Sequence, residues 1–246
     1  MTRWFFIIFF IVPLLLSSCG KDPLTLPARV TFDFEFIAHE EESSLKNTSE
    51  EYSDNVPPNV AAGKLEVNKG KLAIESIEFD GRREEGRDIF FISDLPGPLV
   101  VDLETGTGNQ ELSFDIPQGV YNLIDIYFNM GGDNQIPLIL EGKIKRGAAY
   151  EMPVRFEFNI QEQLRVRAES KNQSSKIVLR KDTTSNAKIV VDAESIFKFV
   201  NPSVLRNASV SVIDGKELIL VNNNNNNGIF NSLASRVEKS VKVIFN

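Results

Sequence analysis

The chain has 246 residues, of which 42% are hydrophobic, and its charged residues give a net charge of −7. The hydrophobic content is sufficient for a folded core, which excludes a chain that is disordered throughout. The negative charge and the lack of a basic stripe argue against nucleic acid as a partner, because lysine and arginine supply the affinity for phosphate backbones.

The chain begins with a short apolar segment that ends at its only cysteine. Arg3 precedes an apolar run over residues 5–16, and two small residues follow the run. This is the layout of a secretory signal peptide. The run is shorter than the roughly 20 apolar residues that a membrane-spanning helix needs. Residues 16–19, Leu-Ser-Ser-Cys, resemble the bacterial lipobox, in which the cysteine is acylated and becomes the first residue after cleavage.

The lipobox resemblance implies that residues 1–18 are a lipoprotein signal peptide and that Cys19 carries a lipid. Two or three acyl chains would anchor the protein durably, since each buried methylene contributes about 0.8 kcal/mol. The mature chain has no second cysteine and cannot form an internal disulfide. We therefore expect a protein of the bacterial cell envelope, attached through Cys19 to the outer membrane on its periplasmic or its surface face.

Period-two alternation of apolar and polar residues dominates the mature sequence and is typical of half-buried strands. It is clearest at residues 30–36, 112–116, 152–160 and 241–245. Further strand candidates lie at 64–80, 88–92, 98–103, 120–128, 136–144, 163–168, 176–181, 187–192, 209–213 and 217–221. Many short strands without long amphipathic helices between them predict an all-β fold, specifically an antiparallel β-sandwich.

Turns and two short helices complete the predicted organisation. Turn-forming residues separate the strands at five places, namely Asp80-Gly81, Pro96-Gly97-Pro98, Pro117-Gln118-Gly119, residues 131–134 and Asp214-Gly215. Helical spacing of apolar residues predicts short helices at 194–200 and 229–237.

The domain prediction follows from these elements. We expect residues 19–27 to be a tether and residues 28–170 to form the β-sandwich domain. Residues 171–246 would form a β-rich C-terminal region with both helices, either separate or part of the same domain.

Two segments interrupt the alternation. Residues 39–63 form an acidic stretch that predicts a solvated loop. The alternative is calcium capture by the carboxylates, although the ligand spacing and central glycine of a calcium loop are missing. Residues 222–227 are six consecutive asparagines, which predict a surface loop that ends in a helix N-cap.

Few parts of a catalytic site are present. The only histidine, His39, has no second histidine or free cysteine to complete a zinc site, and we expect it to be solvated. No Gly-x-Ser-x-Gly turn presents a nucleophile, and the glycine patterns of phosphate and dinucleotide sites are incomplete. The sequence therefore indicates no catalytic residue, no cofactor and no metal site. A pair of carboxylates stays open as an alternative, because a glycoside hydrolase needs only two acids in a cleft.

One short motif suggests a modification. Asp182-Thr183-Thr184 follows a strand candidate and resembles the O-glycosylation signal of exported Bacteroidota proteins. The resemblance makes Thr183 a candidate O-glycosylation site, and a polar turn is the alternative.

A longer stretch resembles a group of proteins. In residues 116–121, Ile-Pro-Gln-Gly-Val-Tyr, a strand ends at a Pro-x-Gly turn and restarts at an aromatic residue. With the strands at 99–103 and 139–142 and the lipobox, this stretch resembles the β-rich, mostly uncharacterised envelope lipoproteins of Bacteroidota. The resemblance covers about residues 64–160. It implies a β-sandwich on the cell envelope and supplies no catalytic residues.

The sequence thus favours a lipid-anchored envelope protein with a non-enzymatic binding, adhesion or structural role. One alternative is an outer-membrane lipoprotein that captures a glycan or small ligand for a transporter, and another is a carboxylate-dependent glycoside hydrolase. The expected partners are the membrane, through Cys19, and an envelope protein or glycan.

Overall fold

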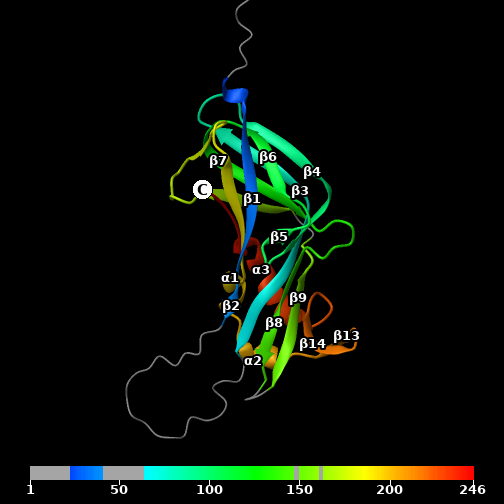
Figure 1. The fold of residues 1–246 in the computed structure, drawn as a ribbon. Coiled ribbons are helices and arrows are strands. Elements are labelled where there is room, and N and C mark those ends of the chain that lie inside the picture. The colour runs from blue at the N-terminus through cyan, green and yellow to red at the C-terminus, as the bar shows by residue number, and fades with distance from the viewer. Residues whose placement is uncertain (1–22, 41–63, 147–149, 161–162) are drawn as a thin grey trace, which may run out of the picture.

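The computed structural model describes residues 23–40, 64–146, 150–160 and 163–246. Most of these residues belong to strands of one mixed sheet, beside which lie three α-helices, so the predicted all-β fold is confirmed. The body is elongated (Figure 1). The first described residues lie at one end, which we call the N-terminal end, and α2 and β13 lie toward the other, the helical end.

The strands are β1 (Pro27–Ile37), β2 (His39–Glu40), β3 (Leu65–Arg83), β4 (Ile89–Asp102), β5 (Thr107–Gly108), β6 (Leu112–Pro117), β7 (Gly119–Met130), β8 (Leu138–Lys145), β9 (Glu151–Phe158), β10 (Leu164–Ser170), β11 (Ile177–Leu179), β12 (Ser185–Asp192), β13 (Ser211–Ile213), β14 (Lys216–Val221) and β15 (Val241–Phe245). The helices are the 3-10 helix η3 (Pro23–Thr25) and the α-helices α1 (Ala193–Phe197), α2 (Pro202–Arg206) and α3 (Asn227–Ser240).

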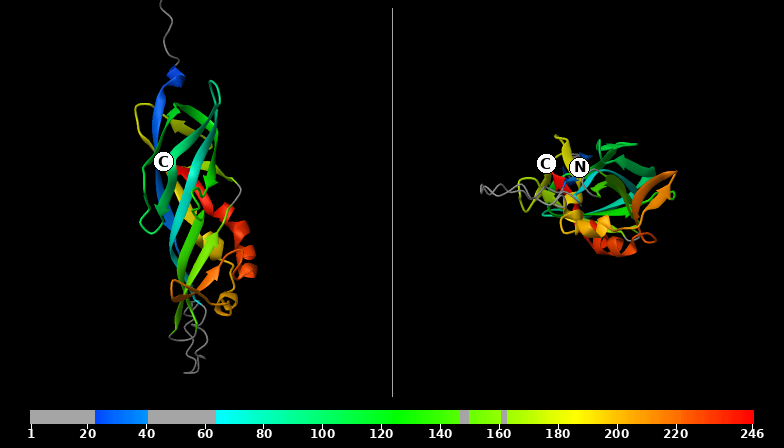
Figure 2. Two further views of the ribbon diagram at one scale, coloured as in Figure 1. Left: turned by 90° about the vertical axis from the view of Figure 1, so that its right-hand side faces the viewer. Right: turned by 90° about the horizontal axis from the view of Figure 1, so that it is seen from below.

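Two of the three α-helices were predicted. The amphipathic segments at 194–200 and 229–237 correspond to α1 and α3, which cover one side of the helical half of the body (Figure 2). The five-residue α2 was not predicted, although its start carries ordinary signals. The side chain of Asn201 caps it by accepting a hydrogen bond from the Ser203 amide, and Pro202 occupies its first turn.

The long strand β3 lies at the centre of the sheet. On one edge, the first part of β3 pairs with β8 and the second part pairs with β7. On the other edge, the first part pairs with β2 and the second part pairs with β4. The full path through the sheet is β13-β14-β9-β8-β3-β7-β10-β15-β12-β1-β6. Strands from residues 28–170 and from residues 171–246 therefore alternate in a single sheet.

Most pairings are antiparallel, as predicted, but three are parallel. β1 runs parallel to β12, β14 to β9, and β10 to β15. Each parallel pair joins a strand that ends by residue 170 to a strand that begins after residue 184, and this long-range pairing has no signature in local alternation.

Aromatic rings join distant parts of the curled sheet. Phe91 of β4 stacks on Phe79 of β3 with ring centroids 5.2 Å apart, and it meets Phe114 of β6 at 5.9 Å. Phe114 in turn contacts Phe32 of β1 at 5.7 Å. Because β6 is the last strand of the sheet path, these contacts show that the sheet bends back over β3 and β4.

Two predicted turns are wrong. Asp80-Gly81 lies inside β3, and Pro96-Gly97-Pro98 lies inside β4. Position 81 requires glycine, because a Cβ at this position would lie 2.5 Å from the ring of Phe79 and 2.6 Å from the ring of Tyr121. The prolines are tolerated because residues 95–98 of β4 form a bulge, in which the β3 partners pass from Ser76 opposite residue 94 to Ile74 opposite Leu99.

The Pro-x-Gly turn between β6 and β7 is held by Tyr121. The Tyr121 side chain is fully buried, and its hydroxyl donates a 2.5 Å hydrogen bond to the carbonyl oxygen of Pro117. Burial raises the pKa of Tyr121 to about 12, and the nearby charge of Arg83 lowers it only in part. The aromatic residue of the motif thus fixes the turn that precedes it.

We predict that Tyr121→Phe destabilises the protein by about 1 kcal/mol, because it leaves the Pro117 carbonyl without this donor. In the native protein the free energy of unfolding falls as the pH rises from about 10 toward the folded-state pKa of about 12, because only the unfolded state then ionises this phenol. The alkaline fall should be smaller in the variant. Chemical denaturation between pH 7 and 11 measures both effects.

Tyr127→Phe is the matched control, since Tyr127 lies half-exposed on the opposite face of β7. Equal losses of stability in the two variants would contradict the role given to the Tyr121 hydroxyl.

Candidate functional site

Of the two residues predicted to be modified, Cys19 and Thr183, the structure describes Thr183. Cys19 and residues 41–63 of the acidic stretch lie outside the described residues. Thr183 is exposed in the turn between β11 and β12, where its amide donates to the Arg180 carbonyl oxygen at 3.4 Å. The polar turn is therefore present, and O-glycosylation of Thr183 stays a prediction.

His39 is buried, which corrects the prediction of a solvated histidine. Only 4% of the residue is exposed, and its Nδ1 lies 2.6 Å from a carboxylate oxygen of Glu194 in α1. Its ring also packs against Phe197, with centroids 5.8 Å apart. The reason for the burial is tertiary, because α1 comes from a segment 155 residues away in the chain. His39 thus fastens β2 to α1 and has a structural role.

The asparagine run forms the predicted surface loop before α3, but its hydrogen bonds differ from those expected. Asn226 occupies the N-cap position of α3 without making a side-chain cap. Its amide instead donates to the carbonyl oxygens of Ser209 and Leu220. Asn222 accepts hydrogen bonds from the amides of Asn224 and Asn225. The run therefore ties α3 to the β13–β14 hairpin.

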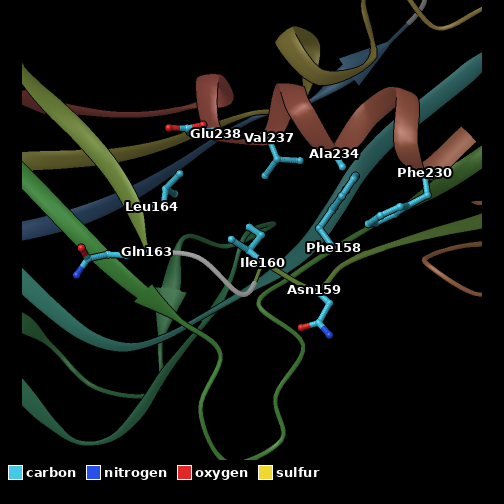
Figure 3. Close-up of a pocket in the computed structure, with 9 residues that line it drawn as sticks. All are labelled: Phe158, Asn159, Ile160, Gln163, Leu164, Phe230, Ala234, Val237 and Glu238. Carbon is cyan, nitrogen blue, oxygen red and sulfur yellow. The ribbon is translucent and has the colours of Figure 1, made fainter.

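An apolar pocket lies between α3 and the region where β9 is followed by β10. Figure 3 shows the side chains that line it, and its volume is about 260 Å³. Six of the nine are apolar, namely Phe158, Ile160, Leu164, Phe230, Ala234 and Val237. Phe158 and Phe230 form one wall as a ring pair, with centroids 5.9 Å apart and ring planes inclined by 30°. The pocket can hold a small apolar group.

The polar residues of the pocket lie at its rim. The carboxylate of Glu238 is directed away from the apolar wall (Figure 3). Gln163 is already engaged outside the pocket, since its amide donates to Glu78 at 2.6 Å and to Asn129 at 3.3 Å. Asn159 lies at the opposite side of the opening. Polar groups at a rim and apolar groups inside suit a ligand that is mainly apolar with a polar end.

Sequence reasoning did not find this pocket. The alternation at 152–160 indicates an inward face, and the helical spacing at 229–237 indicates another. The space between these two apolar faces depends on how α3 packs against the sheet. Local sequence patterns do not encode this packing.

The most buried carboxylate among the described residues belongs to an ion cluster on the outer face of the sheet. Asp125 of β7 is 2% exposed and accepts hydrogen bonds from Arg165 at 2.7 Å and from Arg167 at 3.1 Å. Burial alone would raise the pKa of Asp125, but the hydrogen bonds from Arg167 and Arg165 outweigh it and hold the pKa below its ordinary value. Asp125 is therefore ionised at neutral pH and does not serve as a general acid there.

A polar groove of about 440 Å³ adjoins this cluster. It lies between residues 121–124 of β7 and the loop that connects β10 to β11. On this edge β7 pairs with β11 up to Tyr121 and with β10 from Asp125 onward, so residues 122–124 have no partner there in β10 or β11. Arg167, Asn122 and three serines line it. Its side chains offer hydrogen bonds, but in the described residues no three His, Cys, Asp or Glu side chains gather as a metal site would require.

Within the described ranges, every helix is too short or too polar to cross a membrane. Comparison with known proteins adds no functional assignment, because no family model, no curated protein and no solved structure matches this chain.

Proposed function

We propose that the protein is a lipid-anchored protein of the bacterial cell envelope with a non-enzymatic binding role. The observation that carries this proposal is the apolar segment that ends in the single cysteine, four residues before the first described residue of the fold. The lipid on Cys19 would attach the protein to the outer membrane.

The start of the fold supports a close attachment. Arg83 donates to the carbonyl oxygen of Leu24 at 2.7 Å, and the amide of Gln118 donates to that of Leu26 at 2.8 Å. These bonds fix η3 and the start of β1 at the N-terminal end of the body (Figure 1). Four residues span at most about 14 Å, so an acyl group on Cys19 would keep this end close to the membrane. The helical end would then point away from it.

We predict that Cys19→Ala leaves the precursor uncleaved after Ser18 and without attached lipid, so that the protein is lost from the outer-membrane fraction. Lipid attachment and cleavage both need the thiol, and no other cysteine can replace it. Cell fractionation followed by intact-mass measurement checks both points.

Ser17→Ala is the control, because it keeps a small residue at that position and should preserve anchoring. If the Cys19→Ala protein still partitions with membranes and is still cleaved after Ser18, the lipid anchor is wrong.

A second candidate function is the capture of a small, mainly apolar ligand, and the observation that favours it is the pocket of Figure 3. Its interior offers rings and aliphatic side chains, whereas a glycan needs many hydrogen-bonding groups. Among the capture functions suggested by the sequence, the pocket therefore favours a small ligand over a glycan.

We predict that the protein binds N-phenyl-1-naphthylamine, an uncharged aromatic dye, with a rise in fluorescence. Ala234→Leu should weaken binding about tenfold, because the larger side chain fills space that a ring of the dye would use. Ser235→Leu is the control, since Ser235 is exposed on the same helix and outside the pocket lining. Unchanged dye binding by the Ala234→Leu protein would remove the pocket from consideration.

A further inference from the structure

The mouth of the pocket under α3 carries negative charge. Among the described residues that line the pocket, Glu238 is the only charged one. Its carboxylate lies at the rim (Figure 3), and it forms no ion pair with a described residue. A charge at the mouth of an apolar pocket selects the end group of the ligand, because the polar end of the ligand stays at the rim while its apolar part is buried.

A second carboxylate lies directly behind the rim. The side-chain nitrogen of Gln163 donates to the carboxylate of Glu78 at 2.6 Å and to the side-chain oxygen of Asn129 at 3.3 Å. Because an ionised carboxylate only accepts hydrogen bonds, these contacts fix the orientation of the Gln163 amide and leave its oxygen as a further acceptor. The residues in register with Glu78 are Ile92 and Tyr127, and neither carries a positive charge.

The cations of the elements around the pocket do not neutralise its mouth. They are Arg155 of β9, Arg165 and Arg167 of β10, and Arg236 and Lys239 of α3. Arg155 pairs with Glu157, and both arginines of β10 pair with Asp125. Arg236 donates to the carbonyl oxygen of Ile196 at 3.1 Å. Lys239 leaves the helix about 100° further round than Glu238 and is not a lining residue. Residues 161–162, outside the described ranges, are glutamine and glutamate and add no cation.

The size of the apolar interior limits the buried part of the ligand. The pocket has a volume of about 260 Å³, whereas an apolar cavity of about 150 Å³ is enough for a benzene ring. One aromatic ring with an alkyl chain of about four carbons therefore fits. Such a ring can pack on Phe158 and Phe230 while the end of its chain reaches the rim.

We propose, on the basis of the ligand capture proposed above, that this pocket binds a small amphipathic amine. The ring or alkyl part lies against Phe158 and Phe230, and the ammonium group lies at the rim. There it donates to the carboxylate of Glu238 and to the oxygen of Gln163. A ligand that ends in a carboxylate is disfavoured, since it places an acceptor against acceptors and a negative charge against Glu238.

The test compares three probes that differ only in their end group, namely 4-phenylbutylamine, 4-phenylbutan-1-ol and 4-phenylbutyrate. Each displaces N-phenyl-1-naphthylamine from the purified full-length protein at neutral pH and low salt, where the amine is protonated. We expect the amine to bind about tenfold more tightly than the carboxylate, with the alcohol between them, because a partly exposed charge pair changes affinity a few-fold in each direction. Binding that also occurs to the Ala234→Leu protein lies outside the pocket and is subtracted.

Charge variants test the role of Glu238. Glu238→Gln removes the charge and keeps the length of the side chain, so the advantage of the amine over the carboxylate should fall to about threefold or less. Binding of the uncharged dye and of the alcohol should not change. Glu217→Gln is the matched control, because Glu217 is exposed on β14 outside the pocket lining and its loss changes the net charge equally. Thermal unfolding shows that both variants keep the fold.

Salt provides a second readout on the unaltered protein. High salt should reduce the preference for the amine, because a charge pair at an exposed rim is screened. It should not weaken the binding of the alcohol, which has no charge.

Two outcomes contradict the amine assignment and leave ligand capture in place. One is dye binding together with equal affinities for the amine and the carboxylate, and the other is a preference for the amine that Glu238→Gln leaves unchanged. A protein that does not bind the dye contradicts ligand capture by this pocket itself, and the amine assignment is then lost with it.

Discussion

The pairing of β3 with four other strands is the constraint on which the other features of the structure depend. The strand has 19 residues and is about 60 Å long at the usual rise per residue. Its first residues pair with β2 and β8 toward the helical end, and its last residues pair with β4 and β7 toward the N-terminal end. The N-terminal end, the ion cluster of the outer face and the β9–α3 region are therefore all connected through β3.

Three surfaces of different chemistry lie at separate places on the sheet that is centred on β3. The pocket beneath α3 is mainly apolar, and Phe158 and Phe230 form one of its walls. The outer face of β7 and β10 is polar, and its buried carboxylate is neutralised by Arg165 and Arg167. At the start of β4, the exposed side chains of Phe90 and Ile92 lie in register with Asp80 and Glu78 of β3. Because each surface is built on strands that β3 fixes, a ligand at one need not disturb the others.

Local sequence patterns predicted much of the fold and little of the candidate sites. Alternation located the strands because burial on one face is encoded residue by residue. It failed at Gly81, where glycine makes room for two aromatic rings, and at Pro96, which lies in a bulge of β4, because glycine and proline occur at such places as well as in turns. His39 was misjudged because its partner, Glu194, is remote in sequence. The pocket and the parallel pairings were missed for the same reason.

The position of β1 has a consequence for when the chain can fold. Residues 30–37 pair with residues 185–192, and β12 is bordered in turn by β15 at the C-terminus. Until those strands have been synthesised, β1 has β6 as its only partner among the described strands. Contacts this distant in sequence form slowly. The β1–β12–β15 part of the sheet can therefore close only when the last strands of the chain are present, whereas the pairings of β3 with β4, β7 and β8 need no residue after 145.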